Sequence, residues 1–157
     1  MSDILLPFIS IGTSIHMLFE STFKIRSYHT DGFGHVNNAR HLELLEEARW
    51  RFAEEIGLVP LLRVQQLGFI IIDMRIRFRT PVFDGDTIRI ETSLVTLGSA
   101  SGDVQQVVRK ANSPTISVWS TFHFILIERK SGQSVPIENS IRDILLGILE
   151  KKPVTAN

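Results

Sequence analysis

The sequence of 157 residues contains no cysteine. This absence excludes disulfide bonds, iron–sulfur clusters, cysteine-based zinc sites and a thiol nucleophile. It agrees with a cytoplasmic location, which we predict. Long hydrophobic runs are also missing, because no stretch reaches the roughly 18 consecutive apolar residues that a membrane-spanning helix needs. We therefore expect no membrane span.

The sequence also has no excess of either charge. The 17 Lys and Arg residues balance the 17 Asp and Glu residues, so the formal net charge is zero. Binding to a nucleic-acid backbone relies on surplus positive charge, and we therefore predict no nucleic-acid partner. Hydrophobic residues make up 43% of the chain and charged residues 22%, which is typical of a folded globular protein.

Repeats, low-complexity segments and linkers rich in Pro, Gly or Ser are absent, which predicts a single domain. We assign this domain to residues 18–150, between an N-terminal extension (1–17) and a C-terminal tail (151–157). The domain begins with an alternating pattern that predicts a strand over 19–27. A long helix is predicted over 36–56, because its apolar residues recur every three or four positions. A short helix over 60–66 follows.

From residue 69 the hydrophobic period changes to two, which predicts strands over 69–79, 86–96, 103–111 and 115–127. An amphipathic helix is predicted over 141–149. In the first of these strands the alternation assigns one face to a set of apolar residues (Ile70, Ile72, Met74, Ile76 and Phe78). The opposite face then carries Asp73, Arg75, Arg77 and Arg79.

The short turns between the four strands imply antiparallel hairpins. The fold class is therefore α+β, with one long helix against a strongly curved antiparallel sheet. One helix cannot cover both faces and both edges of such a sheet. We expect a second copy of the chain to cover what remains.

Polar residues are densest in the segment between the first strand and the long helix. Asp31 lies in a glycine-containing loop just before the helix, whose first backbone N–H groups are unpaired and carry a partial positive charge. A carboxylate opposite such N–H groups suits hydrolysis of an activated acyl group, because one side supplies a base or nucleophile and the other stabilises an oxyanion.

Structural roles are also open to these residues. Asp31 before Gly32 is typical of a turn in which the side chain accepts a backbone hydrogen bond. Asn37 and Asn38 are both good helix caps. The set His29, Asp31 and His35 superficially suggests a metal site, but its spacing is irregular and crosses the glycine loop. We predict no metal and no cofactor.

The stretch Asp31-Gly-Phe-Gly-His35-Val-Asn37-Asn38, followed by Leu-Glu-Glu-Ala-Arg49-Trp50, resembles the signature of hotdog-fold acyl-CoA thioesterases of the 4-hydroxybenzoyl-CoA thioesterase family. Within that family it is most similar to the bacterial long-chain acyl-CoA thioesterases of thioesterase III type. The later Arg77-Phe-Arg-Thr-Pro81 and Gly85-Asp86 also match, and the similarity covers residues 18–149. The resemblance implies a hotdog fold, in which a curved antiparallel sheet wraps around one long central helix.

The resemblance further implies an acyl-CoA thioesterase that acts on a medium- to long-chain fatty acyl-CoA, with coenzyme A only as part of the substrate. Asp31 becomes the base or nucleophile, and the backbone N–H of Asn38 polarises the carbonyl. His35 and Asn37 shape the site and order water. His41 departs from the family, which usually has a tyrosine there. A homodimer or a dimer-of-dimers tetramer is the expected assembly.

Two further groups are candidates for binding coenzyme A. Arg75, Arg77 and Arg79 form a basic strip that either is solvated or meets the phosphates of the coenzyme, and Arg109 and Lys110 are further candidates. Gly98-Ser-Ala-Ser-Gly102 superficially resembles a nucleophile elbow, but no serine is central and the segment joins two strands. We interpret it as a hairpin whose Ser99 and Ser101 lie near the coenzyme entrance.

Two alternatives stay open at this stage. A non-catalytic hotdog module would bind acyl-CoA as a sensor or scaffold without releasing thiol. A thioesterase acting on acyl-carrier-protein thioesters would use the same basic strip against an acidic carrier. An assay of thiol release, with both forms of substrate, separates the three.

Overall fold

The computed structural model describes residues 18–149. The extension predicted at 1–17, the tail predicted at 151–157 and the last residue of the predicted domain lie outside the described residues. Within the described part, no helix is long and apolar enough to cross a membrane.

Five strands, three α-helices and one 3-10 turn follow one another along the described chain. The order is β1 (Phe19–Lys24), η1 (Ser27–His29), α1 (Asn38–Glu55), α2 (Leu58–Val64), β2 (Leu67–Phe78), β3 (Thr87–Leu97), β4 (Ser101–Lys110), β5 (Ile116–Glu128) and α3 (Asn139–Leu149). The predicted elements are therefore confirmed, with two shifts. The first strand ends three residues early because the chain turns into η1, and the short helix starts at Leu58, directly after the left-handed Gly57.

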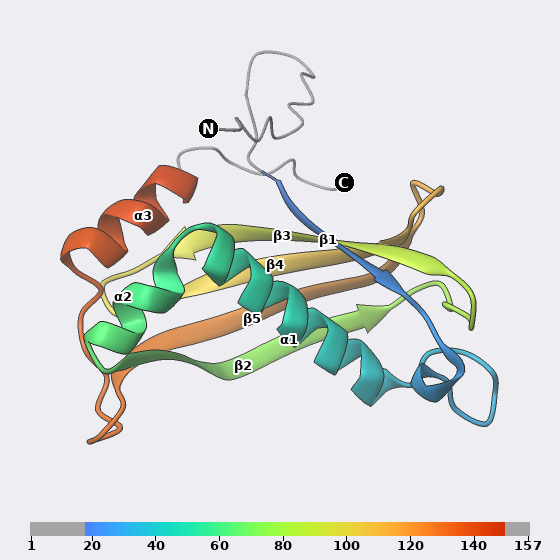
Figure 1. Cartoon of the computed structure of the whole chain (residues 1–157), viewed down its shortest axis with the longest axis horizontal. Coiled ribbons are helices and arrows are strands. Elements are labelled where there is room, and N and C mark those ends of the chain that lie inside the picture. Colours follow the sequence, from blue (N-terminus) through green and yellow to red (C-terminus); the bar gives the residue numbers. More distant parts are fainter. Residues whose placement is uncertain (1–17, 150–157) are drawn as a thin grey trace, which may run out of the picture.

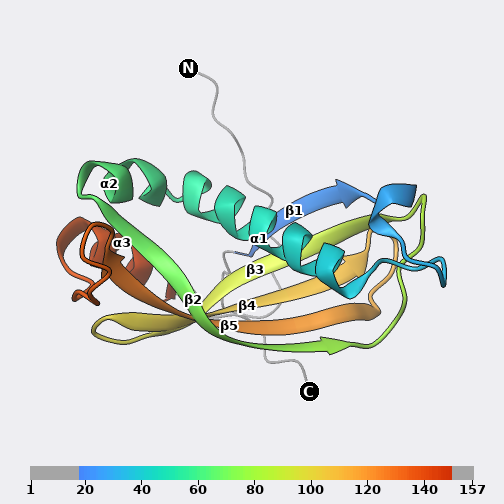
Figure 2. The ribbon, with the colours of Figure 1, turned by 90° about the horizontal axis from the view of Figure 1, so that it is seen from below.

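The strands form one sheet in the order β1-β3-β4-β5-β2, and all neighbours are antiparallel. Figure 1 shows α1 lying across one face of this sheet, and Figure 2 shows the strands curving around it. This is the predicted hotdog arrangement of a curved sheet around a central helix. Strand β2 follows the helices in sequence but pairs only with β5, so it forms one edge of the sheet.

The core lies between α1 and the concave face of the sheet. Alternate residues of the central strands point inward, as the period of two predicted, and they include Ile88, Ile90, Val108, Val118 and Phe122. From the helix, Leu44, Leu45 and Ala48 meet them. A second cluster, built by α2, α3 and the other end of the sheet, extends this core. The described helices thus pack on the same face.

The predicted alternation in β2 is wrong over half its length. A β-bulge interrupts the pairing with β5 between Ile71 and Asp73, and the extra residue reverses which side chains face the helix. Ile71 and Ile76 therefore pack on the core, whereas Ile70 and Ile72 do not. The alternating sequence alone does not reveal where an extra residue enters the strand.

Candidate active site

The segment between β1 and α1 forms a tight hairpin. Thr30 pairs with Val36 in an antiparallel bridge. Inside this bridge the Asp31 N–H donates to the His35 carbonyl at 3.0 Å, and the Gly34 N–H donates to the Asp31 carbonyl at 3.0 Å. Gly34 has φ +83°, a conformation that glycine adopts without strain. The hairpin therefore holds Asp31 and His35 side by side.

The two oxygens of the Asp31 carboxylate have different surroundings. Oδ1 accepts the backbone N–H of Phe33 at 2.9 Å, so Asp31 has the structural turn role that its position before Gly32 predicts. Oδ2 lies 3.9 Å from His35 Nδ1, and the Asp31 side chain is 26% exposed. The turn thus fixes the carboxylate through one oxygen and leaves the other beside the imidazole, within reach of a ligand.

The start of α1 presents unpaired backbone N–H groups. Asn37 is the cap residue: its Oδ1 accepts the Ala39 N–H at 2.8 Å, and its carbonyl accepts the His41 N–H at 3.0 Å. Among residues 18–149, no acceptor is assigned to the backbone N–H of Asn38. The start of α1 therefore offers the Asn38 N–H and its partial positive charge to an anion or a polarised carbonyl.

A cavity of about 280 Å³ opens beside this helix start, and we call it the helix-start cavity. Its lining comes from α1, the end of β2 and the start of β5: His35, Val36, Asn38, His41, Phe78, Arg79, Thr80, Pro81, Val82, Ser117 and Val118. Asp31 is not part of this lining, but its neighbour His35 is. The structure thus brings the predicted His35, Asn38 and Arg79 to one cavity, with Asp31 just behind His35.

These features match a known family. The family model of the thioesterase-like superfamily matches residues 25–145, which include the hairpin, α1, α2 and strands β2 to β5, but not β1. The chain belongs to the thioesterase-like superfamily. It is accordingly a thioester hydrolase.

Individual proteins resemble the chain in sequence or in fold. The long-chain acyl-CoA thioesterase FadM of Escherichia coli (strain K12) is 30% identical over 126 residues, which are 80% of this chain and 96% of FadM. The crystal structure of YbaW, a probable thioesterase from Escherichia coli, has a TM-score of 0.77 at 29% identity and covers 83% of this chain and 98% of its own. SAV2348 from Staphylococcus aureus, solved in complex with CoA, has a TM-score of 0.83 at 13% identity, covering 93% and 92%.

The thioesterase fold separates the members of the predicted basic strip. Arg75 and Arg77 pair with Thr121 and Trp119 of β5, which alternate with the inward side chains and so lie on the convex face of the sheet. The Arg77 guanidinium lies 5.8 Å from the centre of the Trp119 ring. Arg79 follows the end of β2 and lines the helix-start cavity. Within residues 18–149, none of the three arginines forms a salt bridge.

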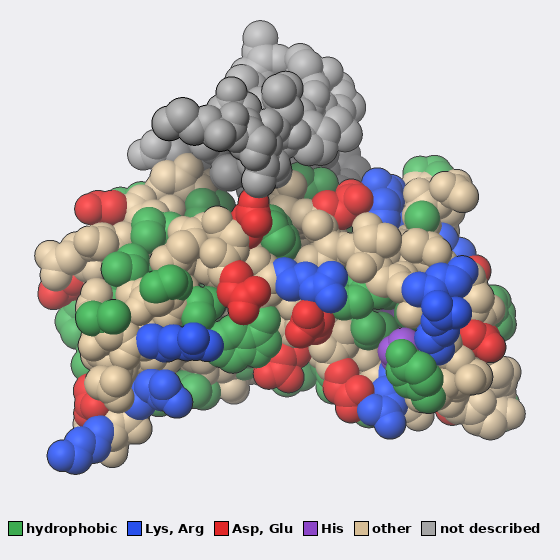
Figure 3. Space-filling view, in the orientation of Figure 1, with side chains coloured by type: hydrophobic (Ala, Val, Ile, Leu, Met, Phe, Trp, Pro, Cys, Tyr) green, Lys and Arg blue, Asp and Glu red, His purple; other side chains and the backbone are tan. Residues whose placement is uncertain are grey.

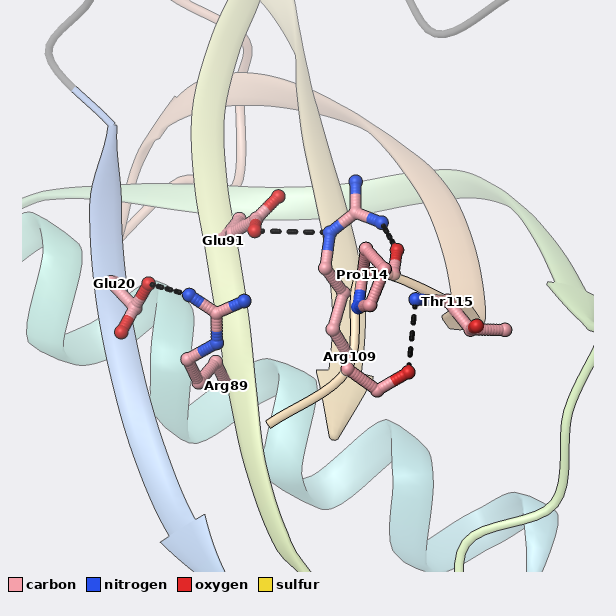
Figure 4. A network of polar contacts seen from close by, with 7 residues as sticks. Glu20, Arg89, Glu91, Arg109, Pro114 and Thr115 are labelled. Carbon is pink, nitrogen blue, oxygen red and sulfur yellow. Dashed lines mark hydrogen bonds and ion pairs between the residues drawn. The ribbon is translucent and has the colours of Figure 1, made fainter. Parts of the chain in front are cut away.

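Arg109 and Lys110 are held by carboxylates of this chain. Figure 4 shows Arg109 between Glu91, at 3.1 Å, and the carbonyl of Pro114. Lys110 lies 2.9 Å from Asp86. Their charges are largely neutralised within the sheet, so they offer less to a phosphate than Arg79 does. Figure 3 shows that basic side chains also gather at the end of the helical face where α1 begins, next to a histidine.

Ser99 and Ser101 lie far from the hairpin along the sheet. Ser99 lies in the turn between β3 and β4, where its carbonyl accepts the Ile137 N–H at 2.7 Å, and Ser101 is the first residue of β4. That turn packs near α3, at the end of the sheet opposite the start of α1 (Figure 1). Within one chain the two serines therefore do not reach the helix-start cavity.

A second and larger cavity, of about 520 Å³, lies at the other half of α1. We call it the apolar cavity, because most of its walls are aliphatic and aromatic side chains of α1, α2, β5 and the start of β2, among them Phe52, Leu58, Leu62, Phe69 and Phe124. Its volume and composition are those of a site for an extended hydrophobic group.

A buried polar network that the sequence pattern does not predict lies beside the apolar cavity. Arg49 donates to Gln106 Oε1 at 2.8 Å, and its guanidinium lies 4.0 Å from the centre of the Phe122 ring. Gln106 is fully buried and donates in turn to the Leu45 carbonyl and to Thr92 Oγ1. Burial lowers the pKa of Arg49 to about 10, and Glu46 partly opposes this shift. Gln106, a long polar residue in an inward position of β4, was the available signal.

The metal alternative finds no support in the geometry. Across residues 18–149, no three His, Asp or Glu side chains gather in a way that could hold a metal ion. His29 Nδ1 accepts the backbone N–H of Arg26 at 3.0 Å, so the ring takes part in the η1 turn. Only Asp31 and His35 of the three residues are close neighbours.

Proposed function

We propose that the protein hydrolyses a fatty acyl-CoA to the free carboxylic acid and coenzyme A, with Asp31 and the start of α1 as its reaction centre. One observation carries this proposal. A single hairpin holds a carboxylate, with one oxygen left out of the turn, directly before a helix whose Asn38 N–H has no assigned acceptor in the described chain. The similarity to FadM, a long-chain acyl-CoA thioesterase, supports the same assignment.

The chemistry requires a base or nucleophile and a site for negative charge. In the first route, Asp31 removes a proton from water, and the water oxygen attacks the thioester carbonyl carbon. In the second route, Asp31 itself attacks the carbonyl carbon. In both routes the Asn38 N–H and the partial charge of the helix start stabilise the oxyanion. The C–S bond then breaks, and the thiolate of coenzyme A takes up a proton. The first route gives the acid directly, whereas the second gives an acyl-enzyme anhydride that water hydrolyses to the acid and free Asp31.

His35 and Asn37 act as positioning residues in this proposal. His35 lies between the Asp31 carboxylate and the helix-start cavity, where it orders water and orients Oδ2. Asn37 caps α1 through its side chain and so fixes the direction of the free N–H. Both roles act through the geometry of other groups, so their loss would affect turnover more than binding.

The acyl chain and the coenzyme occupy different regions of the protein. The apolar cavity, of about 520 Å³, suits a fatty chain because its lining is mostly apolar. Arg79, in the wall of the helix-start cavity and without a salt bridge within residues 18–149, is the best placed cation for a coenzyme phosphate. SAV2348, which shares the fold, was solved in complex with CoA.

A second copy of the chain completes the site in this proposal. Strand β2 forms an edge of the sheet, and it exposes Ile70, Ile72 and Met74 by 44%, 55% and 49%. A long apolar edge strand invites pairing with another strand. Isologous pairing of two β2 edges gives a homodimer and places one copy's reaction centre near the other copy's serine turn and apolar cavity.

Replacing Asp31 by Asn tests the catalytic assignment. We expect kcat for thiol release from fatty acyl-CoA to fall by at least about 100-fold, because the amide can neither take the proton nor attack. The affinity for coenzyme A should stay close to that of the unmodified protein. Asp84→Asn is the matched control, because Asp84 also precedes a glycine in an exposed turn, and its kcat should not change.

Asp31→Asn retaining full turnover would refute the role of Asp31. The same assay with acyl-carrier-protein thioesters of equal chain length tests the alternative substrate. A higher kcat/KM on the carrier-protein form than on the coenzyme A form would move the proposal to that substrate.

A further inference from the structure

His41 has a property that the proposed hydrolysis does not explain. Its side chain is only 4% exposed and lines the helix-start cavity. Its ring nitrogen Nδ1 is buried and has no hydrogen-bond partner among the described residues. Buried polar atoms are nearly always paired, because leaving one unpaired costs its full desolvation free energy. Because the ring that carries this nitrogen lines the helix-start cavity, a ligand there is the available partner once the ring turns the nitrogen toward it.

The environment of His41 keeps its ring neutral. Its nearest aromatic neighbour is Phe78, with 5.6 Å between the ring centres. Burial, aided by the positive charge that His35 can carry, lowers the pKa of His41 to about 4. A neutral imidazole offers one N–H donor and one acceptor nitrogen. The χ2 torsion of histidine is roughly two-fold, so a half-turn exchanges Nδ1 with a ring carbon and lets the same ring present Nδ1 to the cavity.

The position of His41 on α1 indicates which part of a ligand it meets. His41 follows Asn38 by three residues, which is about 4.5 Å along the helix. Helical side chains lean toward the N-terminus, so the His41 ring covers the turn that begins at Asn38. When the thioester oxygen is at the Asn38 N–H, the atoms next to the ring are the first few carbons of the acyl group.

We propose that His41 selects acyl groups that carry an oxygen on the carbon β to the thioester carbonyl. This inference rests on the proposed function, because it places the thioester oxygen at Asn38. A β-hydroxyl can donate to the acceptor nitrogen or accept from the N–H, and a β-keto oxygen can accept. An unsubstituted fatty acyl group leaves the nitrogen unpaired. The required oxygen occurs in aliphatic 3-hydroxyacyl groups and in aromatic 2-hydroxybenzoyl groups.

Matched substrate pairs test this selection. We compare kcat/KM for 3-hydroxydecanoyl-CoA against decanoyl-CoA, and for 2-hydroxybenzoyl-CoA against benzoyl-CoA. For one of the two pairs, the protein should prefer the oxygenated member by roughly 5- to 100-fold, the range expected when a buried polar group gains or lacks its partner. The pair with the larger preference identifies the aliphatic or the aromatic source.

Variants assign the preference to His41. In His41→Phe the preference should fall to about onefold, mainly because kcat/KM for the oxygenated substrate decreases. His41→Leu serves the same purpose if the phenylalanine variant does not fold. Phe78→Leu is the matched control, because it changes the same wall of the cavity without removing the nitrogen. It should alter kcat/KM for both members of a pair by the same factor.

Binding measurements test this inference independently of the proposed hydrolysis. Dissociation constants are measured for non-hydrolysable thioether analogues of the same four acyl-CoA molecules. A β-oxygen preference in binding that His41→Phe abolishes supports the inference even if no thiol is released, in which case only the proposed function fails. Thiol release with equal kcat/KM for both members of each pair, or a preference that His41→Phe retains, overturns the inference.

Discussion

Acidification should destabilise the protein through His41. The ring is buried in the folded state, and its pKa is lowered from 6.5 to about 4 by burial first and by His35 second. Above pH 6.5 neither the folded nor the unfolded chain binds a proton at this residue. Between pH 6.5 and 4 the unfolded chain binds the proton and the folded chain does not. The free energy of unfolding must therefore fall as the pH drops through this window.

The size of the effect follows from the two pKa values. Each unit of difference corresponds to 1.36 kcal/mol, so the full loss below pH 4 is about 3 kcal/mol, given a folded pKa of about 4. Between pH 7 and pH 5 the loss is about 2 kcal/mol. That is a substantial share of the 5–15 kcal/mol that is typical for the total stability of a domain.

Urea unfolding, followed by the fluorescence of Trp50 and Trp119, measures this loss at several pH values. All other titrating groups contribute to both proteins, so the difference between the unmodified protein and His41→Phe isolates residue 41. This difference should change by about 2 kcal/mol between pH 7 and pH 5, in favour of the variant. Leu44→Ala, which truncates a buried neighbour on α1, should lower stability by a pH-independent 2–5 kcal/mol or so. Parallel curves for the unmodified protein and His41→Phe would refute the reasoning.

Two further predictions concern the start of α1 and the edge of the sheet. Asn37→Ala removes the helix cap and should lower the free energy of unfolding by about 1 kcal/mol. It should also lower kcat by a larger factor than it changes KM. The control Glu43→Ala loses only an exposed ion pair with Arg40 and should leave kcat unchanged. Ile72→Lys should convert the proposed dimer to single chains in sedimentation velocity, because it places a charge on the edge of β2, whereas Val95→Lys, on an interior strand, should not. A dimer that survives Ile72→Lys would show that the β2 edge is not the interface.

The fold was predictable because its signals are local and repeated. The stripe of α1 and the alternation of β3, β4 and β5 each extend over ten or more residues, and a single misplaced residue does not hide them. In β2 the alternation was equally clear but gave the wrong face for Ile70 and Ile72. The face on which each β2 side chain lies is set by a bulge in the pairing with β5. Which residue of β2 becomes the extra one depends on the partner strand.

The candidate site was predictable only in part, for a related reason. Asp31, His35 and Asn38 are neighbours in sequence, so a loop and a helix start suffice to bring them together. Arg49 and Gln106 are 57 residues apart and meet only because β4 lies under α1. The arginines of β2 looked equivalent at spacing two, yet only Arg79 reaches the cavity, since the strand ends at Phe78 and the chain then turns.

The two cavities give a physical argument for the proposed dimer. The helix-start cavity is lined by Asn38 and His35, lies next to Asp31 and measures only about 280 Å³, while the apolar cavity has about 520 Å³ and lies at the other half of α1. A two-fold axis through the middle of β2 would reverse the strand, so that its Phe78 end meets the Leu67 end of the other copy. The same rotation brings each reaction centre toward the other copy's apolar cavity. An acyl chain could then begin at Asn38 of one copy and end among the apolar walls of the other, so a variant that separates the copies should lose activity on long chains before short ones.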